Sequence, residues 1–215
     1  MRMLQLSKQT GWFSLLLWLM ASSPARSEQL RVAIASKISF NLGASTPAIV
    51  SDEHGQKLGE LQPQQALVAT VSNDRIAVGN GQVTQLWVKP QQGGYIWIDD
   101  RWYRGSVRVI ATKKQLLAIN HVDLEQYLYS VLGAEMSPTF PTEALKAQAV
   151  AARTYALYRS QSTSQKAFDV DSTQASQVSR GLSGESNTTR AAVNATLGQI
   201  VTYQGKPILA AFHSA

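Results

Sequence analysis

A single carboxylate stands among apolar side chains in the segment GAEMSP, residues 133–138. This residue, Glu135, lies between Ala134 and Met136, and no charged residue follows it before Glu143. Apolar surroundings disfavour the ionised form of a carboxyl, so a carboxyl placed there can donate a proton near neutral pH. Glu135 therefore needs an explanation that a carboxylate on a solvated helix face would not need, and general acid–base chemistry is one that its surroundings allow.

A first helix is predicted immediately before this carboxylate. In DLEQYLYSVLGAEM, apolar residues recur at helical spacing at positions 124, 128, 131 and 132. Asp123 suits the N-cap, and Pro138 and Pro141 prevent the helix from continuing. Glu135 is therefore expected at the end of an apolar helix, just before a proline break.

An alanine-rich helix is predicted directly afterwards, in PTEALKAQAVAARTYALYRSQ. Pro141 suits its first position and Glu143 its first turn. No Gly or further Pro interrupts the pattern. Its many small residues let another backbone approach closely, so this helix is expected to be central.

The polar residues of the alanine-rich helix fall on two stripes. Lys146 and Arg153 are seven residues apart and share one face, while Gln148 and Tyr155 share an adjacent face. The other faces are almost entirely alanine and leucine, so a buried lysine or arginine there needs a partner. The pattern leaves two alternatives open: these charges converge with Glu135 on one site, or they form ordinary salt bridges.

The predicted fold class is α+β, with an antiparallel β-rich N-terminal part followed by a central alanine-rich helix packed on sheet. Short apolar or alternating runs separated by Gly, Pro, Asn and Asp indicate strands. Aromatic residues between positions 87 and 103 fit core packing better than a sugar-stacking surface. A short helix is expected at 187–198, before two strands joined by a turn at Gly205. The predicted strands are residues 30–35, 66–71, 75–79, 84–89, 94–98, 106–110, 116–120, 199–203 and 207–212.

The first 27 residues predict export from the cytoplasm. Arg2 and Lys8 precede the apolar run GWFSLLLWLMA, and small residues follow, as in a secretory signal peptide. An uncleaved membrane anchor is the alternative. Either way, we expect the folded part in the periplasm or cell wall. The remaining chain carries 17 Lys and Arg against 14 Asp and Glu, a net charge of +3. This mild excess suits an anionic cell-wall polymer or membrane surface and not nucleic acid.

Neither a metal nor a cofactor is expected. The chain has no cysteine, which excludes disulfides and Cys-based zinc sites. The three histidines, His54, His121 and His213, are far apart and lack the spacing of metal ligands.

The segment INHVDLEQYLYSVLGAEMSPTFPTEALKAQAVAARTYAL closely resembles the core of the SpoIID/LytB-like family. The family pattern is roughly N-x-V-x-L-E-x-Y-L-x-x-V-x-x-E-M, then P-x-E-A-L-K-A-Q-A-V-A-A-R-T-Y-A. The likeness covers about residues 30–215 and is most specific over 118–157. It divides the chain into a signal peptide at 1–27, a β-rich N-terminal region at 28–105 and a SpoIID-like core at 106–215.

The resemblance implies a peptidoglycan lytic transglycosylase that cleaves glycan strands between MurNAc and GlcNAc, with Glu135 as catalyst. It also implies that polar side chains line the substrate cleft, and the stripe pattern adds Tyr155 to them. These candidate substrate-binding residues are Lys146, Gln148, Arg153, Tyr155, Gln177, His213 and Ser214. A sporulation role belongs to one branch of the family and is not carried over.

A second reading from the same resemblance is a non-catalytic, peptidoglycan-binding enhancer of a cell-wall amidase. Three positions depart from the family pattern: Ser137 separates Met136 from the proline, Phe140 replaces a tryptophan, and Ser179 stands where an aromatic is common. The family also continues past the His-Ser pair, which leaves truncation of the core at the C-terminus open. The retained Glu135 favours the enzyme, whereas Ser179 and the early end favour the accessory protein.

Overall fold

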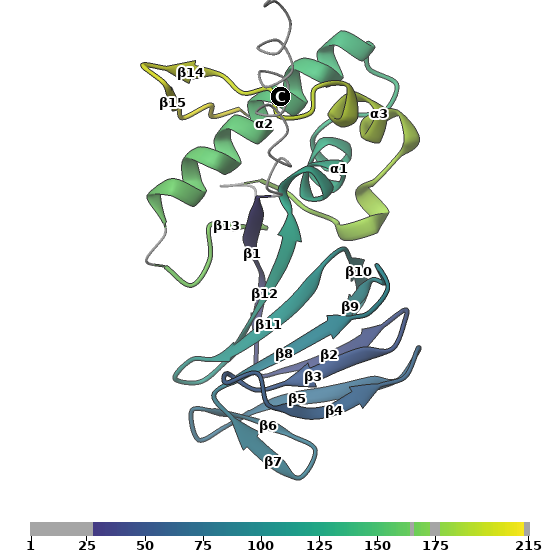
Figure 1. Cartoon of the computed structure of the whole chain (residues 1–215), viewed down its shortest axis with the longest axis vertical. Helices are drawn as coiled ribbons and strands as arrows, with labels where there is room; N and C mark the ends of the chain where they lie inside the picture. The colour runs from purple at the N-terminus through teal and green to yellow at the C-terminus, as the bar shows by residue number, and fades with distance from the viewer. Residues whose placement is uncertain (1–27, 164–165, 173–176, 213–215) are drawn as a thin grey trace, which may run out of the picture.

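The computed structural model describes residues 28–163, 166–172 and 177–212 (Figure 1). Its fold is α+β, as predicted, with two largely antiparallel sheets below and the helices gathered above them (Figure 1). The predicted signal peptide at 1–27, His213 and Ser214 lie outside the described residues. Within those residues, no helix is both long enough and apolar enough to span a bilayer.

Two sheets form a sandwich from the N-terminal half of the chain. The first has the order β13-β1-β12-β11-β8-β3-β4, and only its β1–β13 pair is parallel. Its strands are β1 (Gln29–Lys37), β3 (Ala48–Ser51), β4 (Lys57–Leu61), β8 (Gln85–Pro90), β11 (Ser106–Ala111), β12 (Leu116–Asp123) and β13 (Val170–Asp171). The second sheet, in the order β10-β9-β2-β5-β6-β7, consists of β2 (Ser39–Ala44), β5 (Ala66–Ser72), β6 (Arg75–Val78), β7 (Gly81–Val83), β9 (Ile96–Ile98) and β10 (Arg101–Tyr103).

The core of the sandwich consists of the inward-facing residues of both sheets. Phe40 and Leu42 of β2 meet Leu86 and Val88 of β8, and all four are fully buried. The alternation of buried and exposed positions along these strands matches the two-residue period of a strand. Burial of this apolar surface stabilises the sandwich.

A second core lies between the helices and the upper ends of β1 and β12. It includes Leu30 and Val122 from the strands and Leu128, Leu145 and Val193 from the three α-helices. Ile34 packs against both cores, so the long strand β1 ties the two parts together (Figure 1). The remaining elements are α1 (Leu124–Glu135), α2 (Thr142–Ser162), the 3-10 helix η1 (Gly181–Gly184), α3 (Asn187–Ala195) and the two-stranded sheet of β14 (Thr202–Tyr203) and β15 (Lys206–Pro207).

The three predicted helices are confirmed, but both predicted C-terminal strands are shorter in the structure, and of the run 199–203 only Thr202 and Tyr203 form a strand. Asp123 caps α1, since its carboxylate accepts a hydrogen bond from the Gln126 N–H at 2.9 Å. Pro141 is the N-cap of α2, so the helix begins at Thr142, one residue later than predicted. The last predicted strand, 207–212, is wrong beyond Pro207, because residues 208–212 have no regular structure. The turn at Gly205 is present, with φ +75°.

The boundary expected between residues 105 and 106 stays a prediction. It falls just before β11, and β11 and β12 hydrogen-bond to each other and to strands from the region before the boundary.

The outer face of the first sheet carries a basic cluster. His121 lies 4.5 Å from Trp87 between ring centroids, beside Arg108, and Arg31 faces His121 across the β1–β12 pair. Asp169 pairs with Arg31 at 2.5 Å. Burial first, and then the charges of Arg108, Arg31 and Lys89, lower the pKa of His121 to about 4.

This cluster predicts a loss of stability in mild acid. Because the pKa of His121 is lower folded than unfolded, the unfolded chain takes up its proton first, and stability falls from about pH 6.5 towards pH 4. At pH 5 we expect His121 to cost about 1 kcal/mol, a value reduced for its partial exposure. Urea unfolding of wild type and His121→Gln at pH 7 and pH 5 measures this. An unchanged pH dependence in the variant would contradict the assignment.

Candidate functional site

Glu135 is the last residue of α1, and its side chain is half-buried. The helix ends there because Met136 turns to an extended conformation, while its N–H still donates to the Leu132 carbonyl at 2.9 Å. Oε1 of Glu135 accepts a hydrogen bond from the backbone N–H of Val178 at 3.1 Å. The carboxyl is therefore held in place by a segment 43 residues further along the chain.

Segment 177–180 lies beside this carboxyl and forms hydrogen bonds with both α1 and α2. Gln177 is fully buried, and its Nε2 donates to the Ala152 carbonyl of α2 at 3.0 Å. On the α1 side, Oγ of Ser130 lies 3.1 Å from Oγ of Ser179 and accepts the Arg180 N–H at 3.0 Å. Ser179, which departs from the family pattern, is thus a small buried residue at the contact with α1.

A glycine lets the next segment pack close to the same end of α1. A Cβ at Gly133 would overlap the carbonyl oxygen of Gly184, at the end of η1. Since only glycine lacks a Cβ, Gly133 allows η1 to pack on α1 two residues before Glu135.

Two buried tyrosines, Tyr127 of α1 and Tyr155 of α2, belong to the core between the helices. Burial raises the pKa of Tyr127 far above its usual value, and electrostatic interactions with Tyr155, Asp171 and Glu135 add to the effect. The phenol therefore stays neutral. Among the described residues its hydroxyl has no hydrogen-bond partner. Tyr155 meets Phe212 edge-on, with ring centroids 6.4 Å apart.

Tyr127 and Asp171 were not predicted from the sequence. The spacing of Tyr127 and Glu135, eight residues, places both on one side of a helix and could have indicated Tyr127. Asp171 lies in β13, and its position depends on the parallel pairing of β13 with β1, for which the sequence gives no local signal.

Arg153 is almost completely buried and is paired with Glu125 of α1. Nε and Nη2 of Arg153 donate to the two carboxylate oxygens of Glu125 at 2.8 and 2.7 Å. The same guanidinium donates to the carbonyls of Val193 and Gln199 at 3.3 and 3.0 Å. Arg153 therefore joins α1, α2 and the end of α3.

Lys146 also forms an ion pair within the helical part. Its Nζ donates to Oε1 of the exposed Glu143, one turn earlier on α2, at 2.8 Å. Gln148 is half-buried on the stripe that it shares with Tyr155. Of the two alternatives left open by the sequence, the described contacts of Lys146 and Arg153 are thus salt bridges. Gln177 precedes Val178, whose N–H donates to Glu135, whereas the ring of Tyr155 contacts Phe212.

Comparison with known proteins finds a family model that matches part of the sequence. Residues 112–203 match the family model of SpoIID, the stage II sporulation protein, and this span includes all of α1, α2 and Glu135. This part of the chain is similar to the SpoIID domain. Its first helix ends in the candidate catalytic residue, and its second helix and segment 177–180 hold that residue in place.

Three other proteins have sequences similar to part of this chain. An uncharacterized protein of Brachyspira hyodysenteriae is 42% identical over 114 residues, which are 53% of this chain and 31% of that protein. The stage II sporulation protein D of Bacillus subtilis is 38% identical over 124 residues, 51% of this chain and 36% of that protein. The amidase enhancer of Bacillus subtilis is 42% identical over 88 residues, 41% of this chain and 12% of that protein. The chain spans about a third or less of the length of these relatives.

Proposed function

We propose that this protein is an exported peptidoglycan lytic transglycosylase, with Glu135 as acid and then base. The SpoIID domain and the relatives support a cell-wall-related function. The observation that carries the finer proposal is the placement of Glu135: a half-buried carboxyl at a helix end, oriented by the Val178 N–H. Peptidoglycan glycan strands are the proposed substrate, and the periplasm or cell wall is the proposed location.

The reaction needs one carboxyl because the sugar supplies its own nucleophile. Glu135 donates its proton to the glycosidic oxygen as the bond between that oxygen and C1 of MurNAc breaks. The C6 hydroxyl of the same sugar then bonds to C1 and returns a proton to the Glu135 carboxylate. The product is a 1,6-anhydro sugar, and no water is consumed. Glycoside hydrolysis, by contrast, usually requires two carboxyls.

The residues around Glu135 support this role by fixing its position. Gln177 and Ser130 anchor the segment that donates to Oε1, so the carboxyl oxygen has a defined direction. Met136 is half-buried beside it, and Tyr127 is a neutral buried neighbour. A catalytic group must be held within a narrow range of geometry, and these contacts would do so.

A second candidate function is a peptidoglycan-binding enhancer of a cell-wall amidase. The observation that favours it is the 42% identity with the amidase enhancer of Bacillus subtilis. In this case the partner would be an amidase, and Glu135 would not act chemically.

Two parallel incubations distinguish the two functions. We expect the purified chain to release 1,6-anhydro ends from glycan strands stripped of peptides, detected by mass spectrometry. A parallel incubation measures the rate of a cell-wall amidase on intact peptidoglycan with and without the chain. Faster amidase action without anhydro product would overturn the enzyme proposal in favour of the enhancer.

A further inference from the structure

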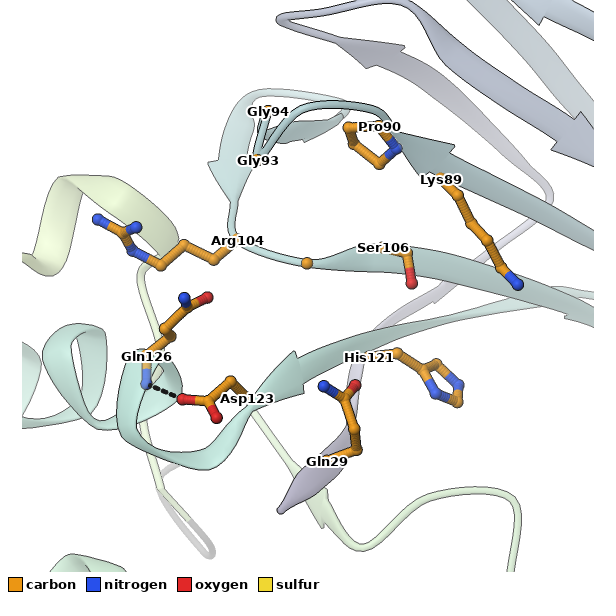
Figure 2. A pocket seen from close by; sticks show the side chains of 11 residues that line it. Gln29, Lys89, Pro90, Gly93, Gly94, Arg104, Ser106, His121, Asp123 and Gln126 are labelled. Carbon is orange, nitrogen blue, oxygen red and sulfur yellow. Dashed lines mark hydrogen bonds between the residues drawn. The ribbon is translucent and has the colours of Figure 1, made fainter. Parts of the chain in front are cut away.

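A polar cavity of about 530 Å³ lies at the opposite end of α1 from Glu135 (Figure 2). It is bounded by the end of β8, the turn before β11, the end of β12 and the first turn of α1. Its size is within the range of small-molecule sites in proteins. The lining residues that matter here are Gln29, Lys89, Arg104, Ser106, His121 and Gln126.

Several lining groups have unused hydrogen-bonding capacity. Within the described part of the chain, the side chains of Gln29, Ser106 and Gln126 form no hydrogen bond with one another or with the protein around them. Nε2 of His121 is buried and also has no partner among the described residues. Two amides and a hydroxyl can both donate and accept, which suits a ligand rich in hydroxyl and amide groups.

One end of the cavity is positively charged. Lys89 extends there (Figure 2), with its Nζ 4.6 Å from the centre of the Trp87 ring, and the Arg108 guanidinium lies 5.8 Å from the centre of the same ring. Neither cation has an ion-pair partner among the described residues, whereas Arg31 nearby is paired with Asp169. At the other end Arg104 is neutralised by Glu185, with N–O distances of 2.8 and 2.9 Å. An anionic group is therefore favoured beside Lys89.

The cavity is separate from the carboxyl at the far end of α1. Gln126 and Glu135 are nine residues apart, which in a helix is about 13 Å along the axis and about half a turn around it. A small ligand bound beside Gln126 therefore cannot touch Glu135.

We propose that this cavity binds a saccharide that carries a carboxylate. The carboxylate lies beside Lys89, and the hydroxyl and amide groups of the sugar bond to Gln29, Ser106 and Gln126. The choice of a sugar rests on the proposed function, in which the glycan contains MurNAc, whose lactyl group is a carboxylate when no peptide is attached. The cavity then holds a sugar other than the one at the cleavage site.

Titration of the whole chain with MurNAc, followed by backbone amide NMR, tests this. We expect the amide signals of Ser106 and Gln126 to shift with MurNAc and to shift less with GlcNAc, which lacks the carboxylate. Lys89→Gln should weaken the MurNAc response at these amides about fivefold, the loss expected for a solvent-exposed charge contact. Lys113→Gln, which removes an exposed lysine of the β11–β12 turn, is the matched control and should leave the affinity unchanged.

Two results would overturn the inference. One is an absence of shifts at Ser106 and Gln126 at saturating MurNAc. The other is an equal response to acetate alone, which would make the cavity a general anion site. The Val178 amide reports separately on the neighbourhood of Glu135. If the chain cleaves glycan strands but the Ser106 amide does not shift with MurNAc, only this inference is wrong. If the Ser106 amide shifts but no glycan is cleaved, only the proposed function is wrong.

Discussion

Replacing Glu135 with Gln is expected to lower the release of 1,6-anhydro ends by about 10²–10⁴-fold, the usual contribution of a general acid–base group. The amide can neither donate a carboxylic proton nor take one from the C6 hydroxyl. It keeps the size of the side chain, and its oxygen can still accept the Val178 N–H that Oε1 accepts now. The rate is measured by mass spectrometry on peptide-free glycan strands, with thermal unfolding as a check of folding.

Glu60→Gln is the matched control for this experiment. Glu60 is an exposed carboxylate of β4 whose contact is a salt bridge to Lys57, so its loss should change neither rate nor folding. Full cleavage by Glu135→Gln would contradict the single-carboxyl mechanism. Stimulation of an amidase that survives in Glu135→Gln, together with no cleavage by wild type, would leave the enhancer as the function.

Most of the sandwich could be predicted because its longer strands alternate. All seven runs predicted before residue 121 coincide with strands of the structure. The strands that were missed are short or interrupted by turn-forming residues: β2, β3, β4, β7 and β10. In β2, for example, the residues NLGA are typical of a loop. The strand nevertheless pairs with β5 and β9, and Phe40 and Leu42 are fully buried. Pairing with neighbouring strands, and not local preference, determines such segments.

The C-terminal run PILAAF shows the opposite error. Its apolar residues predicted a strand, but only Lys206 and Pro207 pair with β14. Phe212 instead packs against Tyr155 of α2. A short apolar run does not by itself distinguish a strand from an irregular segment that covers a core.

For the site, helical spacing predicted which face a side chain occupies but not which partner it meets. It placed Glu135 at a helix end and required a partner for a buried Arg153. The partners themselves are distant in sequence: Glu125 is 28 residues from Arg153, and Val178 is 43 residues from Glu135. Such contacts depend on how α1, α2 and segment 177–180 pack, which no local pattern specifies.

Arg153→Met is expected to destabilise the fold by about 3 kcal/mol, because it leaves the Glu125 carboxylate without its partner in a largely buried position. The carbonyls of Val193 and Gln199 lose a donor as well. In a chain of this length the loss corresponds to about 6–12 °C in Tm. Urea unfolding and calorimetry measure it. The double variant Glu125→Leu with Arg153→Met should regain part of the loss, since no buried charge then remains.

Lys146→Met tests the same stripe of α2 where the ion pair is exposed. Its partner, Glu143, has an 83% exposed side chain, so the expected loss of stability is at most about 0.5 kcal/mol.

The resemblance predicts that both Lys146 and Arg153 contact substrate, whereas the ion pair with Glu125 predicts a structural role for Arg153. An Arg153→Met chain as stable as wild type but slower in glycan cleavage would contradict the structural role. A large loss of stability, with the cleavage rate per folded molecule unchanged, would instead remove Arg153 from the substrate-binding residues and leave Lys146 to be tested alone.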